Sequence, residues 1–312
     1  MSGRVKEVVS VSIGSSTRDH EVELELMGQR IRIRREGTDG DIEAAKARFE
    51  ELDGTVDAFG LGGIDLLLRI DAREYFFRDA KRMISGVEKT PVVDGTGLKH
   101  VLEARAVHWM SQEMNLDLSG KRALMTAAVD RYGMAEALYR AECEMSYGDL
   151  LFALGVPVLI HRWSTLHAMI RLVAPIATKL PFTWLYPTGS EQEAPTTEEK
   201  ADLYHANDII AGDYLYVRKF MPSRMDGAWV VSNTTTAADV EDLRARGVEL
   251  LVTSTPRLEG RSFGTNAMEA AMVALAGADG ELPPEVYMAM AQQMGFAPDV
   301  TWLQGADVVA AI

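Results

Sequence analysis

Residues 228–255 read AWVVSNTTTAADVEDLRARGVELLVTST, and this stretch decides the fold class. The apolar runs at 228–232 and 249–253 have the length and composition of buried strands, and residues 237–246 between them have helical spacing. A further helix is expected over 266–276. Strands that alternate with helices through short loops are typical of a doubly wound parallel sheet. We therefore expect an α/β protein whose C-terminal part is Rossmann-like.

The two loops that follow these strands are candidates for binding an anion. Each places hydroxyls, amides and free backbone N–H groups at a strand-to-helix junction, where the partial positive charge of the helix favours a phosphate or a carboxylate. Successive βα units would set the loops side by side at the carboxyl edge of the sheet. The alternative is that Thr236, and Thr265 or Asn266, are only helix N-caps. The candidate residues are Asn233, Thr234, Thr235, Thr236, Arg257, Arg261, Ser262, Thr265 and Asn266.

A chain of 312 residues is long for a single hydrophobic core, so two domains are expected. A polar connection at 115–120 marks the boundary and gives domains at 1–117 and 118–312. The first is expected to be a mixed α/β substrate or cap domain with β-hairpins at 20–34 and 66–77. The second is expected to be the Rossmann-like nucleotide- or anion-binding domain, with a C-terminal tail that could pack back on the first.

The composition of the chain excludes several classes of binding partner. The net charge of −14 argues against nucleic acid or an anionic membrane, so a small anionic substrate would need arginines placed close to it. The single cysteine, Cys143, excludes an internal disulfide, and the histidines show no metal-ligand spacing. The N-terminus lacks an apolar signal segment and no apolar run is long enough to span a bilayer, so a cytoplasmic protein is expected. A homodimer is expected because dimers are common among such folds.

The turn after the strand at 121–126 has the spacing of a dinucleotide site but lacks its glycines. Setting Gly133 on the last glycine of G-x-G-x-x-G puts Ala128 on the first and Asp130 on the second. Asp149 follows Ala128 by 21 residues (149 − 128), close to the usual spacing of the ribose-binding carboxylate. A carboxylate at the middle position would repel a pyrophosphate, so a cofactor either sits differently or does not bind. Asp130 itself is either an N-cap or a catalytic carboxylate.

Proton chemistry is predicted at the glycine-rich segment 94–99, where Lys99 falls in the first turn of a helix and Asp94 precedes it. The positive end of a helix disfavours the charged lysine, whereas a nearby carboxylate favours it, and such a lysine can act as a general acid or base. It can also bind a carboxylate, or be an ordinary solvated lysine. Two further loops at strand ends supply candidates for binding the substrate, namely Ser15, Ser16, Arg18 and Asp65.

These motifs together resemble a family of bacterial proteins labelled quinate 5-dehydrogenase. The resemblance covers nearly the whole chain and includes the two loops described above. The further stretches that carry it are VSIGSSTRD (11–19), GLGGID (60–65), VDGTGLK (93–99), VDRYGMA (129–135), GDL (148–150) and IAGD (210–213). Quinate and shikimate dehydrogenases use a Lys–Asp pair over the substrate and a glycine-rich NAD(P) loop. The resemblance implies that Lys99 stands for that lysine, although the chain has no Asn-Thr-Asp-Gly stretch to supply the aspartate.

The leading hypothesis is an NAD(P)-dependent oxidoreductase that acts on a small polyhydroxy carboxylate. The 128–133 turn, Asp149 and the 233–236 loop would hold the cofactor, and Lys99 with Asp94 or Asp130 would move the hydroxyl proton. One alternative is a non-redox enzyme, a lyase or a transferase, that binds a phosphorylated or carboxylated small molecule. Another is a ligand-binding protein without catalytic activity. We expect no metal site.

Overall fold

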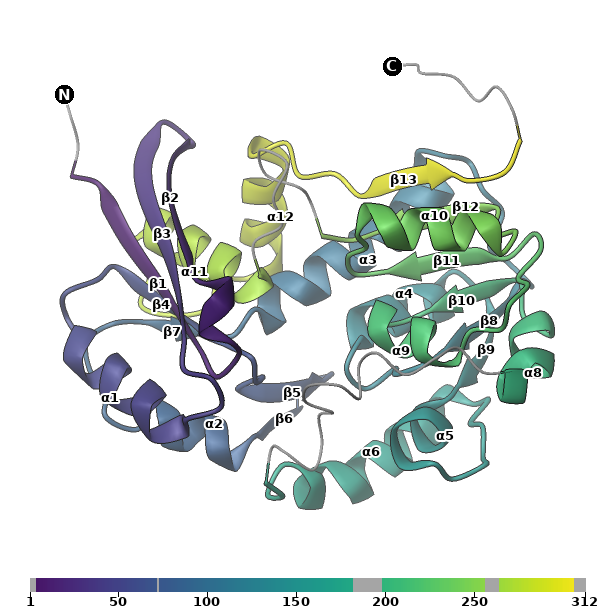
Figure 1. Ribbon diagram of the computed structural model, residues 1–312, viewed down its shortest axis with the longest axis horizontal. Coiled ribbons are helices and arrows are strands. Elements are labelled where there is room, and N and C mark those ends of the chain that lie inside the picture. Colours follow the sequence, from purple (N-terminus) through teal and green to yellow (C-terminus); the bar gives the residue numbers. More distant parts are fainter. Residues whose placement is uncertain (1–3, 72, 182–197, 256–263, 306–312) are drawn as a thin grey trace. The chain divides into compact units, whose positions relative to one another are not determined.

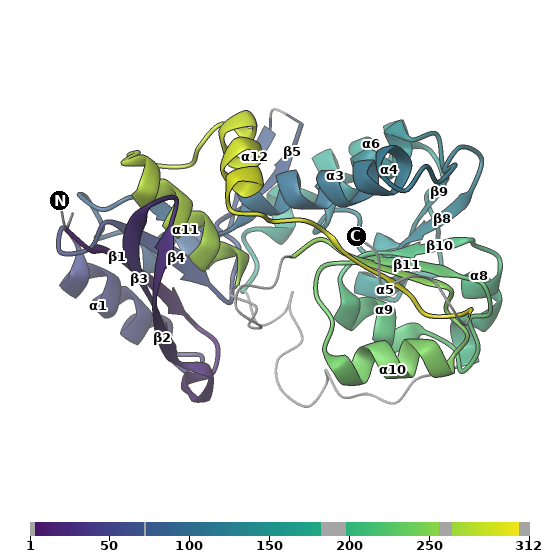
Figure 2. The ribbon, with the colours of Figure 1, turned by 90° about the horizontal axis from the view of Figure 1, so that it is seen from above.

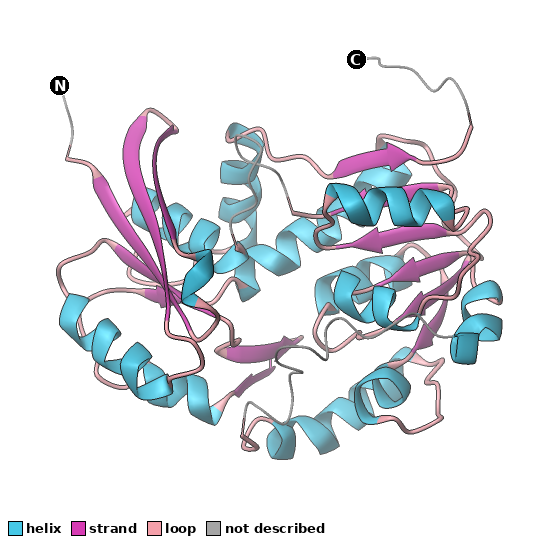
Figure 3. Cartoon of the chain, in the orientation of Figure 1, coloured by secondary structure: helices cyan, strands magenta, loops and turns pink. Residues whose placement is uncertain are grey.

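The computed structural model describes residues 4–71, 73–181, 198–255 and 264–305, and it divides into two compact units. The first unit contains the described residues up to 101, together with 173–181 and 264–296. The second contains 102–172, 198–255 and 297–305. Each unit is built around its own sheet, drawn as magenta strands in Figure 3. Within the described residues, no helix is long and apolar enough to cross a bilayer.

The first unit contains a five-stranded sheet in the order β2-β3-β1-β4-β7. Strands β1, β3, β4 and β7 are parallel, and β2 is the antiparallel arm of a hairpin with β3 (Figure 1). The expected mixed α/β architecture with hairpins is therefore confirmed. The elements are β1 (Lys6–Ser12), η1 (Ser16–Arg18), β2 (His20–Leu26), β3 (Gln29–Gly37), α1 (Ile42–Leu52), β4 (Ala58–Gly62), β5 (Leu67–Ile70), β6 (Arg73–Phe76), α2 (Arg78–Met83) and β7 (Val92–Val93).

Local sequence explains where these elements begin and turn. The Asp41 side chain accepts the N–H of Ala44 and so caps α1. The β2–β3 hairpin turns through Met27 and Gly28, both of which have positive φ angles of the kind that two-residue hairpin loops need. Apolar side chains of β1, β4, α1 and α2 then form one continuous core, which includes Phe49 and Phe59 in edge-to-face contact.

The second unit contains a six-stranded sheet in the order β13-β12-β11-β10-β8-β9. Five of its strands are parallel, and β13 runs antiparallel to β12 at one edge. The predicted Rossmann-like parallel sheet is confirmed. The elements are α3 (Thr96–Gln112, shared with the first unit), β8 (Arg122–Met125), α4 (Tyr132–Arg140), β9 (Glu144–Tyr147), α5 (Asp149–Leu154), α6 (Trp163–Ala177, also shared), η3 (Glu198–Lys200), α8 (Ala201–His205), β10 (Ile209–Ala211), α9 (Tyr214–Phe220), β11 (Trp229–Ser232), α10 (Ala237–Ala245), β12 (Leu250–Thr253) and β13 (Asp299–Trp302).

The chain is divided differently from the single boundary expected near residue 117. The chain first passes from the first unit to the second between residues 101 and 102, inside α3. The helices α11 (Thr265–Ala276) and α12 (Pro284–Gln293) belong to the first unit. Helix α11 packs on β1 and β4, as Figure 2 shows. Its alanines and the glycines of β4 allow a close approach, since a Cβ atom at Gly60 would lie 2.9 Å from the carbonyl oxygen of Asn266. The segment after β12 therefore returns to the first sheet instead of covering its own.

Candidate functional site

The carboxyl edge of the first sheet brings Lys99 and Asp65 together. Asp65 follows β4, and Lys99 lies in the first turns of α3, directly after β7. Lys99 Nζ lies 3.6 Å from Asp65 Oδ2, and the two side chains are 12% and 23% exposed. An ammonium and a carboxylate at this distance form an ion pair that solvent still reaches. Asp65, predicted as a substrate-binding residue, is thus the acidic group opposite Lys99.

Asp94 has a different environment from the one expected for a proton-transfer partner. Its Oδ1 accepts the N–H of Thr96 at 2.8 Å, and its Oδ2 accepts the Thr96 hydroxyl at 3.0 Å. The same Oδ2 accepts the N–H groups of Leu66 and Leu67, the two residues after Asp65. Asp94 therefore caps the start of α3 and ties the Asp65 segment to it, which sets the geometry of the Lys99–Asp65 pair.

The loop after β1 is held by its own contacts. Ser15 caps the short η1 helix, and the backbone N–H and hydroxyl of Ser16 both donate to the carboxylate of Asp39. Arg35, which the sequence analysis missed, donates to the Ser15 carbonyl at 2.9 Å and to the Ser12 hydroxyl at 3.2 Å. Burial, followed by the nearby Arg18, lowers the pKa of Arg35. In the sequence, Arg35 could have been noticed as a charged residue on the inward-facing side of an alternating strand, near the end of that strand.

The second predicted anion loop contributes to packing in the first unit. Asn266 donates from Nδ2 to the Ser10 hydroxyl at 2.7 Å, and Thr265 is the first residue of α11. The start of this loop lies beside 233–236 as expected, since the Thr255 N–H donates to the Asn233 carbonyl at 3.0 Å. Helix α11, which follows the loop, belongs to the first unit and packs on β1 and β4. Arg257, Arg261 and Ser262 lie outside the described residues.

In the second sheet, the strand order reverses between β8 and β10. The chain connections on the two sides of this point run in opposite directions. In open α/β sheets, ligands bind at such a switch point, beyond the carboxyl ends of the strands. Gly212 follows β10 with a φ of 141°, and a Cβ atom there would lie 2.2 Å from the hydroxyl oxygen of Thr126 after β8. Only glycine allows the two strand ends to approach this closely.

Beside this switch point, a buried cluster forms around Arg131. Its guanidinium contacts Glu103 at 3.0 Å, Asp130 at 3.1 Å and the carboxylate of Asp213. Burial works against the charged guanidinium, but Asp130, Asp213 and Glu103 raise the pKa of Arg131 above its ordinary value. Asn233, predicted to bind cofactor, donates from Nδ2 to Asp213 at 2.9 Å and so joins the cluster. Arg131 and Asp213 were missed as site residues, although they lie in the turns that follow β8 and β10.

Asp149 is linked to the turn after β8, as its spacing from Ala128 suggested. Its Oδ1 accepts the Val129 N–H at 2.8 Å, whereas its buried Oδ2 has no hydrogen-bond partner among the described residues. Burial raises the pKa of Asp149 to about 6, and the backbone N–H groups that it accepts oppose that shift. Ala128 and Gly133 are themselves buried in the turn and in the first residues of α4.

The threonines after β11 serve mainly the helix that follows them. The Thr236 hydroxyl accepts the N–H of Asp239, and the Asp239 carboxylate accepts the N–H of Thr236 in return, a complete capping box. Thr235 is buried and Thr234 half-buried. The N-cap alternative thus describes Thr236 in this structure.

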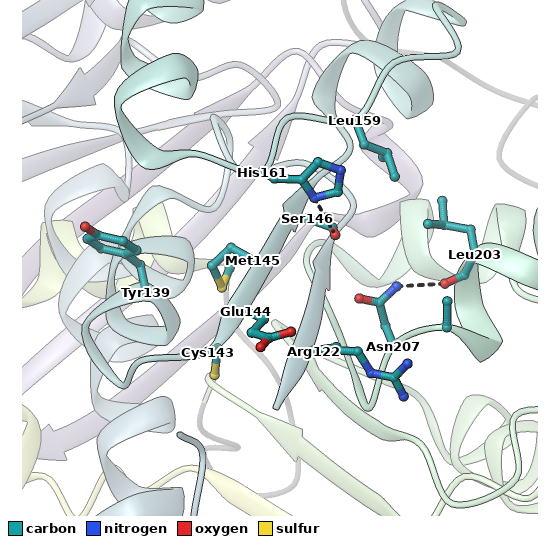
Figure 4. A pocket seen from close by; sticks show the side chains of 11 residues that line it. Arg122, Tyr139, Cys143, Glu144, Met145, Ser146, Leu159, His161, Leu203 and Asn207 are labelled. Carbon is teal, nitrogen blue, oxygen red and sulfur yellow. Dashed lines mark hydrogen bonds between the residues drawn. The ribbon is translucent and has the colours of Figure 1, made fainter. Parts of the chain in front are cut away.

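A separate pocket of about 620 Å³ lies beside β9, and none of the predicted site residues is among those that line it (Figure 4). His161 Nδ1 and the Ser146 hydroxyl are 3.2 Å apart in it. The described residues contain no group of three or more His, Cys, Asp or Glu side chains that could hold a metal ion. The pocket is lined by Arg122, Tyr139, Cys143, Glu144, Met145, Ser146, Leu159, His161, Leu203, Ala206 and Asn207.

Solved structures with related topology share little sequence with the chain. A malic enzyme from Entamoeba histolytica is 11% identical over 92% of this chain and 61% of that one, with a TM-score of 0.46. An L-tryptophan dehydrogenase from Nostoc punctiforme is 12% identical over 94% and 80%, with a TM-score of 0.39. A galactofuranose binding protein is 12% identical over 93% and 98%, with a TM-score of 0.38. Such distant likenesses do not identify an activity.

Family models cover both parts of the chain. Residues 7–94 match the model described as Domain of unknown function (DUF8753), and residues 97–303 match Domain of unknown function (DUF8754). A search of curated proteins finds no match. Because the second match spans more than half of the sequence, the chain belongs to the DUF8754 family.

Proposed function

We propose that this protein is an NAD(P)-dependent oxidoreductase that acts on a small polyhydroxy carboxylate of the quinate type. The observation that carries the proposal is the Lys99–Asp65 pair at the carboxyl edge of the first sheet, with 3.6 Å between Nζ and Oδ2. Lysine is suited to taking a proton from a hydroxyl group and returning it in the reverse reaction. Asp65 holds the amine in place, and the capping bonds of Asp94 hold both segments.

The chemistry of Lys99 follows from its position. In the direction of alcohol oxidation, Lys99 Nζ accepts the proton of the substrate hydroxyl group, while a hydride leaves the carbon that carries this hydroxyl. In the direction of reduction it donates that proton to the forming alkoxide. Asp65 stabilises the ammonium form, which is the form that donates the proton in the reduction, whereas the oxidation starts from the neutral amine. A bound nicotinamide cofactor supplies the hydride acceptor or donor.

Two features of the second sheet support a dinucleotide. The switch point between β8 and β10 lies at a place where such folds bind nucleotides. The buried Oδ2 of Asp149, which has no hydrogen-bond partner among the described residues, is an acceptor suited to a ribose hydroxyl. Asp130 occupies the middle-glycine position, and Arg131 next to it offsets its charge. The ribose end of the cofactor therefore fits the residues present better than the pyrophosphate does.

The test is thermal unfolding of the full chain with NAD, NADH, NADP or NADPH, each at millimolar concentration. A nucleotide at about a hundred times its Kd stabilises the folded state by roughly 2.7 kcal/mol. Asp149→Asn should lose most of this shift, whereas Asp202→Asn, which removes an exposed carboxylate on α8, should keep it. Oxidation of quinate and of shikimate is then followed by absorbance of the reduced nucleotide. No shift with any of the four would rule out the redox proposal.

A second candidate is a non-redox enzyme that uses the same Lys99–Asp65 pair. The turn after β8 favours this candidate, because Ala128 is buried and the Val129 N–H is already bonded to Asp149, so neither is available to a dinucleotide. A lyase or transferase would then act on a carboxylated or phosphorylated molecule. Its test is the same unfolding experiment with phosphorylated and carboxylated metabolites in place of nucleotides. Stabilisation that Lys99→Met removes, with no response to nucleotides, would establish this candidate over the first.

A further inference from the structure

A buried acid lies against the turn of α3 that leads to Lys99. Glu269 on α11 is 1% exposed, and its Oε1 accepts the hydroxyl of Tyr287 on α12 at 2.5 Å. The Tyr287 oxygen in turn accepts the backbone N–H of Leu282 at 3.0 Å. Both side chains come from the segment that returns to the first unit. The acid is thus fixed by two helices instead of being free to turn toward solvent.

The carboxyl group of Glu269 occupies space that a side chain on α3 would need. A Cβ atom at Gly97 would lie 2.6 Å from Oε1 of Glu269, and closer still to Oε1 of Glu281. Two carboxyl groups therefore press on the same backbone position in the first turn of α3. A side chain at position 97 would displace at least one of these carboxyl groups, so Glu269, which Tyr287 holds, packs directly against this turn.

Two other carboxylates, those of Asp94 and Glu281, lie close enough to act on Glu269. Asp94 lies at the start of α3, and Glu281 lies between α11 and α12. Arg69 on β5 contacts both oxygens of Glu281 and also binds Glu74 at 2.8 Å. Burial raises the pKa of Glu269 to about 8, with Asp94 and Glu281 adding to the shift, whereas Tyr287 and the Gly95 N–H oppose it. Burial thus favours the neutral form of Glu269 near pH 7.

This turn positions both members of the pair. The Lys99 N–H donates to the Gly95 carbonyl at 2.8 Å, in the same turn that Glu269 contacts. Asp94 binds the N–H of Leu66, the residue after Asp65. We propose that Glu269, held by Tyr287, is a positioning residue for the Lys99–Asp65 pair, an inference that rests on the proposed function. In its neutral form it supports the first turn of α3, and its ionisation adds a negative charge beside Asp94 and Glu281 that displaces the turn.

The experiment compares the pH dependence of the wild type with Glu269→Gln, which keeps the shape of the neutral acid. The wild-type rate on a polyhydroxy carboxylate should fall about tenfold from pH 7 to pH 9, as the fraction of neutral Glu269 falls. Glu269→Gln should keep its rate over this range. Tyr287→Phe removes a hydrogen bond that favours the ionised acid, so its alkaline limb should move to higher pH. Glu285→Gln, which removes an exposed charge on α12, should behave like the wild type.

A second readout does not depend on activity. Reductive methylation of Lys99, measured by peptide mass spectrometry relative to Lys46 on α1, reports how accessible the Lys99 amine is. Between pH 7 and pH 9 this ratio should rise severalfold in the wild type and stay level in Glu269→Gln. The same pH dependence in both proteins overturns the positioning role, even where turnover is seen. Absence of turnover with the predicted difference in labelling instead overturns the proposed function and leaves the positioning role supported.

Discussion

The carboxyl edges of the two sheets both gather charged side chains, but they balance the charge differently. In the second sheet, Arg131 is enclosed by three carboxylates, and Asn233 binds one of them. In the first, Lys99 has Asp65 at 3.6 Å, and solvent reaches both side chains. A guanidinium keeps its charge at any physiological pH, whereas the amine of a lysine can give up or take a proton. We therefore expect proton transfer at the edge of the first sheet, and a network of charges that holds the strand ends together at the edge of the second.

The largest expected effect is on activity at the first edge. Lys99→Met should lower the turnover of a polyhydroxy carboxylate by about 10²–10⁴-fold, because the proton acceptor is lost. Asp65→Asn should lower it less, since the amine remains. The control is Lys46→Met, which removes a half-buried amine that pairs with Glu50 on α1. Turnover that survives Lys99→Met would remove this edge as the catalytic one.

At the second edge the largest effect should be on stability. Arg131→Met leaves Glu103, Asp130 and Asp213 without their shared cation and should cost about 3–5 kcal/mol of unfolding free energy. Urea unfolding followed by circular dichroism measures it. Arg122→Met is the matched control, because its pair with Asp208 is exposed and should be worth less than about 1 kcal/mol. Equal losses in the two variants would contradict the contrast between the edges.

Asp149, at the edge of the second sheet, should make the unfolding free energy depend on pH. Its pKa is about 6 in the folded protein and lies near the ordinary 3.8 when unfolded. Because the folded state binds the proton more tightly, the stabilisation is complete below pH 3.8 and is lost as pH rises through 6. The wild type should therefore lose about 3 kcal/mol relative to Asp149→Asn between pH 4 and pH 7.5. Urea midpoints at several pH values measure this difference, and parallel curves would show that Asp149 is not desolvated.

The close approach of β8 and β10 should be sensitive to one methyl group. Gly212→Ala places a Cβ atom against the Thr126 hydroxyl at a φ of 141°, and should cost roughly 1–3 kcal/mol. Gly280→Ala is the control, because nothing lies within 4 Å of the added atom. Thermal unfolding of the two variants compares them directly. A stable Gly212→Ala protein would mean that the strand ends are further apart in solution.

The smallest effect concerns the loop after β11. Thr236→Ala removes the capping box of α10 and should cost about 1 kcal/mol. If the hydroxyl serves only the helix, stabilisation by nucleotides should be unchanged in this variant. A loss of that stabilisation would instead show that the loop contacts the ligand. The result thus decides whether the Thr236 hydroxyl has a structural role or a ligand-binding one.

Local patterns predicted most of the elements, because strands, hairpins and helix starts depend on neighbouring residues. The hairpin predicted at 20–34 and the helix predicted at 237–246 are examples. The spacing of Asp149 from Ala128 also brought those segments together, through the Val129 N–H. What failed depended on contacts distant in sequence. Nothing near 265–276 indicates that α11 covers β1 and β4, and nothing near Lys99 indicates Asp65 as its partner.

The packing of α11 on β1 and β4 also has a consequence for synthesis of the protein. About 200 residues separate β4 from α11, so a growing chain needs roughly 10–40 s to produce that helix after the strands have left the ribosome. During that interval one apolar face of the first sheet has no cover from its own chain. Nascent chains of this protein are therefore expected to depend on chaperones, and a fragment ending near residue 117 should aggregate when expressed alone.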